Sequence, residues 1–199
     1  ANQAKSDAFD AYVLADHVRT DRERLSPLVP NSPQASELKL LTRDYHSLVQ
    51  QQTRLLNQLK TELKAYYPRV LELFNDLNTP AVRDFLQTYP TPEALKGLSL
   101  KRWQRFGKAH RFSHGYIQRQ FEELRVPQLS IPAHVVRARS RKMLVLLDQL
   151  EVTAQAVSDY KKEIETFFSS LPVAELARTL PGGKSGVTVP SVFAELGDA

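Results

Sequence analysis

The sequence predicts an all-α fold built around a long antiparallel coiled-coil hairpin that carries a small helical insertion. In residues 37–67 and 143–168, apolar side chains recur at alternating spacings of three and four. Heptad helices have this pattern. The chain of 199 residues contains only 7 glycines but 12 prolines. This balance favours helices separated by prolines over a sandwich or barrel, which needs many glycine-rich turns.

The N-terminal region predicts one short helix followed by a linker. Residues 6–19 contain recurring apolar positions behind Ser6 and Asp7, either of which can cap a helix N-terminus. The stretch 22–36 holds three prolines and shows no periodicity. Because each proline removes a backbone donor and disfavours helix in the residue before it, we expect an extended linker there.

The two heptad stretches predict long helices that pair along apolar seams. The first stripe is Leu38, Leu41, Tyr45, Leu48, Gln52, Leu55, Leu59, Glu62 and Tyr66. The second stripe is Met143, Leu147, Leu150, Ala154, Val157, Lys161, Ile164 and Phe168. We expect Leu55, Leu59, Leu147 and Leu150 to be buried at these seams. Pairing within one chain is the simplest arrangement, and pairing between chains is the alternative that periodicity leaves open.

Shorter helices are predicted between and after the heptad stretches. Pro68 marks the end of the first long helix or a kink in it. Thr79-Pro80, Thr91-Pro92 and Ser99 each begin a short helix, and residues 116–124 form another. After Pro172 we expect a helix over 173–180, a turn at Pro181-Gly182-Gly183 and a helix over 187–196.

Charge is distributed unevenly along the chain, and this points to a polyanionic partner. The net charge is +5, but residues 101–142 contain eleven Lys or Arg and only two acids, so this segment carries +9. Trp103 and Phe106 are expected to pack inward while neighbouring cations face solvent. The candidate nucleic-acid-binding residues are Lys101, Arg102, Arg105, Lys108, Arg111 and Arg119.

Composition also excludes several classes of site. The chain has no cysteine, which excludes disulfides, thiolate metal sites and a cysteine nucleophile. No apolar run reaches the roughly 18 residues that a membrane span needs. The N-terminal residues lack the apolar core of a signal peptide, so we expect a cytoplasmic location.

Asp7 and Asp10 are the candidate catalytic and metal-binding residues. They lie three residues apart, so a helix places both carboxylates on one face. Paired carboxylates can bind Mg²⁺ and leave room for phosphate oxygens. The alternative is that both acids only complement the dipole at the N-terminus of the helix.

Four stretches, in this order, resemble a family of bacterial insertion-sequence transposases. They are residues 5–15, read as K-S-D-x-x-D-A-x-x-L-A, then Arg43–Leu59 within the first heptad stretch, Phe85–Glu93 around the Tyr-Pro-Thr-Pro-Glu run, and Leu180–Gly183 with Phe193–Asp198. The family is that of the DEDD transposases, which combine a RuvC-like domain with a serine domain. It is related to the Piv-type DNA invertases and consists of bridge-RNA-guided recombinases. The resemblance covers nearly the whole chain.

The resemblance implies a partial Mg²⁺ site in this chain. In the family four acids of a RuvC-like domain bind Mg²⁺, and Asp7 and Asp10 match the last two. We therefore expect a fragment that lacks the N-terminal sheet with the other two acids and the C-terminal region with the serine nucleophile. Its expected parts are the last helix of the RuvC-like domain (1–21), a linker (22–36), a coiled-coil and basic helical region (37–172) and the start of the C-terminal transposase domain (173–199).

These observations lead to one functional prediction and one alternative. We expect part of a transposase or site-specific recombinase associated with the bacterial nucleoid, whose role is to bind DNA and guide RNA and to form a homo-oligomer through the coiled coil. The fragment itself is expected to be inactive as an enzyme. The alternative is a non-catalytic helical interaction or dimerisation module that binds an acidic partner. Gly182–Ser185 resembles a phosphate-binding loop only in its Gly-Lys-Ser end, which is a weak signal.

Overall fold

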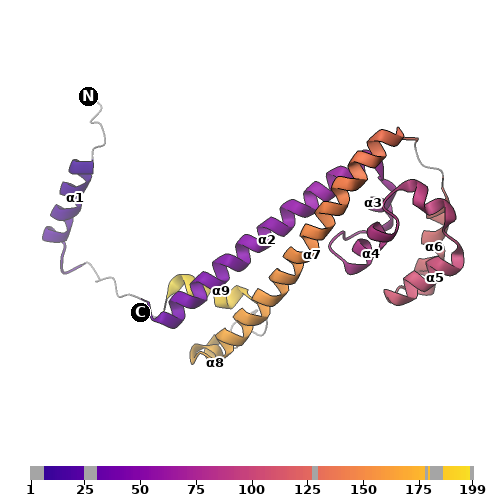
Figure 1. Ribbon diagram of the computed structural model, residues 1–199. Helices are drawn as coiled ribbons and strands as arrows, with labels where there is room; N and C mark the ends of the chain where they lie inside the picture. Colours follow the sequence, from indigo (N-terminus) through magenta and orange to yellow (C-terminus); the bar gives the residue numbers. More distant parts are fainter. Residues whose placement is uncertain (1–6, 25–30, 127–129, 178, 180–185, 198–199) are drawn as a thin grey trace.

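The computed structural model describes residues 7–24, 31–126, 130–177, 179 and 186–197, and the regular structure in these residues is entirely helical. This confirms the predicted all-α class. Two long helices, α2 (Pro33–Tyr66) and α7 (Ala133–Ser169), lie side by side and run in opposite directions (Figure 1). The predicted antiparallel hairpin therefore forms within one chain.

The insertion lies at the end of the hairpin where α2 ends and α7 begins. It contains α3 (Arg69–Leu73), α4 (Pro80–Thr88), the 3₁₀ helix η1 (Pro92–Gly97), α5 (Leu100–Ala109) and α6 (His114–Arg125). Two short helices, α8 (Val173–Ala177) and α9 (Thr188–Leu196), lie at the opposite end of the hairpin (Figure 1). The predicted glycine turn at 181–183 falls outside the described residues.

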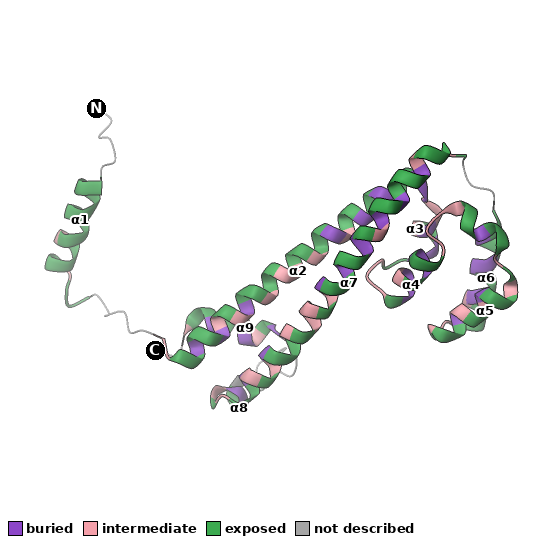
Figure 2. Cartoon of the chain, in the orientation of Figure 1, coloured by how far each residue is buried: buried purple, intermediate pink, exposed green. Residues whose placement is uncertain are grey.

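The helix α1 (Asp7–Thr20) lies apart from the hairpin and contains no buried residue (Figures 1 and 2). Apolar side chains such as Tyr12, Leu14 and Val18 are exposed on it. An isolated helix of this length is marginal in water, and α1 gains no burial from the hairpin. The predicted cap residue Ser6 lies outside the described part of the chain.

The seam between α2 and α7 is the main core of the molecule. Leu59, Leu147 and Leu150 are fully buried and Leu55 is 7 % exposed, which confirms their predicted burial. Burying a leucine contributes roughly 1.5–3 kcal/mol. In the middle of the hairpin the seam is looser, because Tyr45, Leu48 and Gln52 of α2 are only half-buried.

Both long helices begin earlier than their heptad stripes predict. Ser32 Oγ accepts a hydrogen bond from the Ala35 N–H at 3.1 Å, and Pro33 occupies the first turn, so α2 starts inside the predicted linker. The helix α7 starts ten residues before Met143. Val136 and Ser140 continue its buried side through a run of arginines that hides the apolar stripe in the sequence.

A buried carboxylate links the two long helices near the insertion. The Glu62 side chain on α2 is 3 % exposed, and its oxygens lie 2.9 Å from Arg139 and 2.7 Å from Lys142 on α7. Burial favours the neutral acid, but hydrogen bonds from the two cations outweigh it and lower the pKa of Glu62. Arg139 and Lys142, two cations of the basic segment, therefore stabilise the contact between α2 and α7.

The C-terminal helix α9 docks against the beginning of α2 over a second core. This core contains Leu38, Ile164, Phe168, Ala174, Val187 and Ala194. Above it, Glu195 pairs with Arg43 at 2.9 Å and with Lys39 at 3.2 Å. Gly197 ends α9 with φ of 81°, a left-handed conformation that glycine adopts without steric cost.

Candidate nucleic-acid interface and metal site

The insertion presents its basic residues on the outside of α5, of α6 and of the turn between them. The candidate residues Lys101, Arg102, Arg105, Lys108, Arg111 and Arg119 are all exposed. Lys101, Arg105 and Lys108 follow spacings of four and three, which places them on one face of α5. Within the described residues none of the six pairs with a carboxylate, so their charges are available to an external anion.

Rings on the inner side of α5 hold this surface in place. Trp103 is fully buried, and its Nε1–H donates to the Ile117 carbonyl of α6 at 2.9 Å. Phe106 is half-buried and stacks on Trp103 with ring centroids 5.2 Å apart. The prediction that both rings pack inward is confirmed. Gly107 faces Ile117 so closely that an added Cβ would lie 2.5 Å from Ile117 Cγ1, which explains the glycine.

The turn between α5 and α6 contains an unusual residue, Arg111. Its φ is 58°, and it is the one non-glycine residue with positive φ in the described part of the chain. The Arg111 N–H donates to Lys108 O at 3.1 Å and the Phe112 N–H donates to Gly107 O at 2.8 Å. These bonds form a C-terminal helix cap that usually contains glycine at the left-handed position. From the sequence Arg111 is predicted only as a charged residue, because propensity gives no sign of this conformation.

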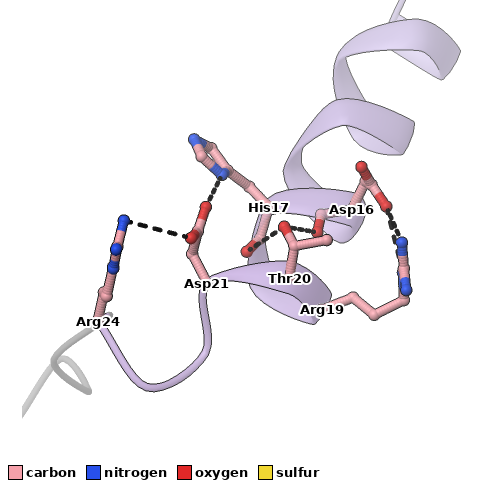
Figure 3. Close-up of polar contacts among 6 residues, drawn as sticks. All are labelled: Asp16, His17, Arg19, Thr20, Asp21 and Arg24. Atoms are coloured by element: carbon pink, nitrogen blue, oxygen red, sulfur yellow. Dashed lines mark hydrogen bonds and ion pairs between the residues drawn. The ribbon is translucent and has the colours of Figure 1, made fainter.

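The two candidate metal ligands lie in the first turn of α1. Asp7 and Asp10 are exposed there and take part in no ion pair or hydrogen bond among the described residues. Their spacing puts both on one face of the helix, as predicted. At the other end of α1 the acids are already paired, Asp16 with Arg19 at 2.7 Å and Asp21 with His17 at 2.9 Å (Figure 3).

The carboxylates of α1 fit a metal site only as part of a ligand set. In the part of the chain that the structure describes, no three His, Cys, Asp or Glu side chains gather as a metal site would require. Mg²⁺ in phosphate-processing sites is held by one or two protein carboxylates together with phosphate oxygens and water. Asp7 and Asp10 can supply these two carboxylates. Their position in the first turn also fits the alternative role of complementing the helix dipole.

Comparison with known proteins connects this arrangement to transposition. Residues 1–68 match the profile of the DEDD transposases of the IS110 type, described as a transposase family. The putative transposase of the IS117 mini-circle of Streptomyces coelicolor is 31 % identical over 99 % of this chain and 49 % of its own length. The chain is similar to the IS110-type transposases, over residues 1–68 in the family profile and over almost its whole length in the IS117 relative.

Other relatives agree with this family. A putative transposase of Sinorhizobium fredii is 37 % identical over 45 % of this chain and 25 % of its own length. An uncharacterized protein of insertion element IS116 from Streptomyces clavuligerus is 28 % identical over 90 % of the chain and 45 % of its own length. The chain thus spans half or less of the curated relatives it matches. No solved structure matches it.

None of the helices that the structure describes is both long enough and apolar enough to span a bilayer.

Proposed function

We propose that this IS110-type segment binds nucleic acid for an insertion-sequence transposase, with DNA or a guide (bridge) RNA as its ligand. The observation that carries the proposal is the group of six exposed cations on α5, on α6 and in the turn between them, from Lys101 to Arg119, that have no carboxylate partners among the described residues. Phosphate groups of a polynucleotide can replace the missing partners. Each phosphate contact releases condensed counterions, which makes binding strongly dependent on salt.

The fold supports this role by keeping the cations in fixed positions. Phe106 and Trp103 anchor the inner side of α5, and the Trp103–Ile117 hydrogen bond ties α5 to α6. The backbone positions that carry the outer cations therefore keep a constant spacing. Because they contact phosphates, they provide affinity and register without selecting a base sequence.

The proposal predicts a steep dependence of affinity on salt. If about four of the cations contact phosphates, the slope of log affinity against log salt for a stem-loop RNA is near −3 to −4. Replacing Arg102, Arg105 and Arg111 with Glu should flatten this slope and weaken binding by at least about a hundredfold at 0.15 M salt. Fluorescence anisotropy titrations at several salt concentrations measure both quantities.

A matched triple variant separates local contacts from net charge. Arg54, Lys60 and Lys64 are exposed on α2, outside the insertion. Changing these three to Glu alters the net charge by the same amount, and we expect a much smaller loss of affinity. Equal losses for the two triple variants would show that the insertion has no special role.

The alternative, a helical module that binds an acidic protein, makes a different prediction in the same titration. Polyglutamate would then bind the insertion as tightly as RNA of equal charge. The ring-supported face favours nucleic acid, so we expect RNA or DNA to bind more tightly.

For the whole transposase we propose that Asp7 and Asp10 hold Mg²⁺. The metal would stabilise charge on the phosphate during strand cleavage. The support is the family match over residues 1–68 together with two exposed acids in one helical turn. Two carboxylates alone should bind Mg²⁺ weakly and leave the present chain without nuclease activity. Cleavage of DNA by this chain that requires Mg²⁺ and disappears in Asp7→Ala would contradict this.

We also propose that the chain is divided into the four predicted parts, residues 1–21, 22–36, 37–172 and 173–199. Within the third part, the hairpin provides the contacts of a homo-oligomer. The support is apolar surface on the outside of α7, where Val145 and Val152 are 51 % and 72 % exposed. They lie seven residues apart and so share one face of the helix. Light scattering should show an oligomer for the parent chain and a smaller mass for the variant in which both valines are replaced with Glu.

A further inference from the structure

A second feature of the insertion is an aromatic pocket beside its basic surface. The pocket has a volume of about 420 Å³. His110, Phe112 and Tyr116 line it together with Asn75, Asp76 and Thr79 from the segment before α4. The volume lies within the range of small-ligand sites.

The aromatic walls of this pocket are held by packing and hydrogen bonds. Phe112 and Tyr116 meet edge to face with ring centroids 5.0 Å apart, and the Tyr116 hydroxyl donates to the Leu73 carbonyl at 3.0 Å. His110 contacts Phe106 with centroids 4.5 Å apart, and its Nε2 lies 3.2 Å from Asp84. The rings are therefore positioned before any ligand arrives, so binding does not have to restrict their motion.

Cations stand next to the aromatic walls. Arg111 directly precedes Phe112, and the Arg119 guanidinium carbon lies 5.9 Å from the centre of the Tyr116 ring. A ligand that places a flat ring against these aromatic side chains and an anionic group beside two arginines is complementary to this arrangement. A nucleotide has both groups, whereas an apolar peptide would leave the arginines without partners.

Asn75 provides a means of hydrogen bonding to such a ring. It is exposed, lines both this pocket and a neighbouring cavity of about 330 Å³ behind Tyr116, and its side chain makes no hydrogen bond among the described residues. An amide offers both a donor and an acceptor, which suits the edge of a nucleobase.

We infer that this pocket binds one unpaired nucleobase of the bound nucleic acid, stacked on Phe112 and in contact with Tyr116, with Asn75 at the base edge and Arg111 and Arg119 on the flanking phosphates. The inference rests on the proposed function, because the basic surface has to bring the strand to the pocket. It adds selectivity for unpaired segments to a surface that otherwise recognises only charge. Stacking on aromatic side chains does not depend on base sequence and strengthens binding considerably.

The test compares two stem-loop RNAs with the same stem and the same number of phosphates. One has a loop of seven uridines, and the other has a loop of seven abasic nucleotides. We expect the parent chain to bind the uridine loop roughly tenfold more tightly than the abasic loop. Phe112→Leu should bring this ratio close to one without changing the salt slope. Phe121→Leu, which removes a ring that lines neither cavity, serves as the matched control and should keep the ratio.

A second measurement covers the case in which Phe112→Leu does not fold. Cross-linking of 4-thiouridine in the loop to the unmodified chain, followed by peptide mapping, should place the cross-links at Phe112 or Tyr116. Equal affinity for the two loops with a steep salt slope would overturn the inference and leave the proposed function intact. The proposed function itself fails if neither RNA binds in a salt-dependent way.

Discussion

Arg111 combines an unfavourable backbone conformation with an exposed charge in the basic surface. A left-handed conformation costs a residue with a Cβ roughly 1–2 kcal/mol, whereas glycine adopts it freely. The hydrogen bonds from the Arg111 and Phe112 N–H groups keep the residue there. We therefore expect that the Arg111 side chain binds a ligand, and that this binding compensates for the unfavourable backbone conformation.

We therefore predict that replacing Arg111 raises the stability of the fold and lowers the affinity for RNA. Arg111→Gly should raise the free energy of unfolding by about 1 kcal/mol, which corresponds to roughly 2–4 °C in Tm for a chain of this size. The same variant should bind stem-loop RNA more weakly, because one phosphate contact is lost. Calorimetry and anisotropy on the same preparation measure the two effects.

Arg111→Asn is the control, since asparagine tolerates the left-handed conformation and carries no charge. We expect it to lose as much affinity as Arg111→Gly while gaining less stability. If Arg111→Gly melts at a lower temperature than the parent chain, the conformation at Arg111 is not the source of strain.

At the scale of elements, the seam between α2 and α7 dominates stability. Leu59 is fully buried in it, so Leu59→Ala should lower the free energy of unfolding by about 2–5 kcal/mol. Leu40 lies on the same helix but is 66 % exposed, and Leu40→Ala should change stability by less than about 0.5 kcal/mol. Urea denaturation followed by circular dichroism measures the stability of both variants. Similar midpoints for Leu59→Ala and Leu40→Ala would show that the seam does not dominate stability.

The sequence predicted the elements whose signals are local and missed those that depend on contacts between distant residues. The heptad stripes predicted the hairpin, and the Ser/Thr-Pro signals predicted α4 and η1. The short helix α3 was not predicted, because it follows directly after α2 at Pro68, which was interpreted only as an end or a kink. The first turns of α7 were missed because arginines interrupt the apolar pattern there.

The same distinction applies to the candidate site. The spacing of Trp103 and Phe106 correctly predicted which side of α5 is exposed, so the basic surface followed from the sequence. The aromatic pocket did not, because Asn75 and Phe112 come together only when the segment before α4 packs beside the turn between α5 and α6. The carboxylates of α1 gave a clear signal in sequence, and their role stays a prediction.

Over the whole molecule, the hairpin separates two groups of helices. The insertion with its basic surface lies at one end, and α8 and α9 lie at the other (Figure 1). The contact between α9 and α2 fixes the second end through Glu195, Lys39 and Arg43. Arg43 and Glu195 lie in two of the stretches that resemble the transposase family, so the fold brings these two distant stretches into contact.

This contact predicts a specific dependence on pH. Hydrogen bonds from Arg43, and then from Lys39, lower the pKa of Glu195 from its ordinary value of 4.5 to about 2. Because the folded-state pKa is the lower one, the ion pair stabilises α9 docking fully above about pH 4.5, and this contribution is lost as the pH falls toward 2. Solvent and salt screen the exposed pair, so high salt should reduce the effect. The protection of α9 amides against hydrogen exchange, measured relative to the intrinsic exchange rate at each pH, should therefore fall across this window in the parent chain. In Glu195→Gln this protection should be lower already at neutral pH and change less as the pH falls. A parent chain whose α9 protection stays constant from pH 5 to pH 2 would show that apolar contacts alone hold the helix.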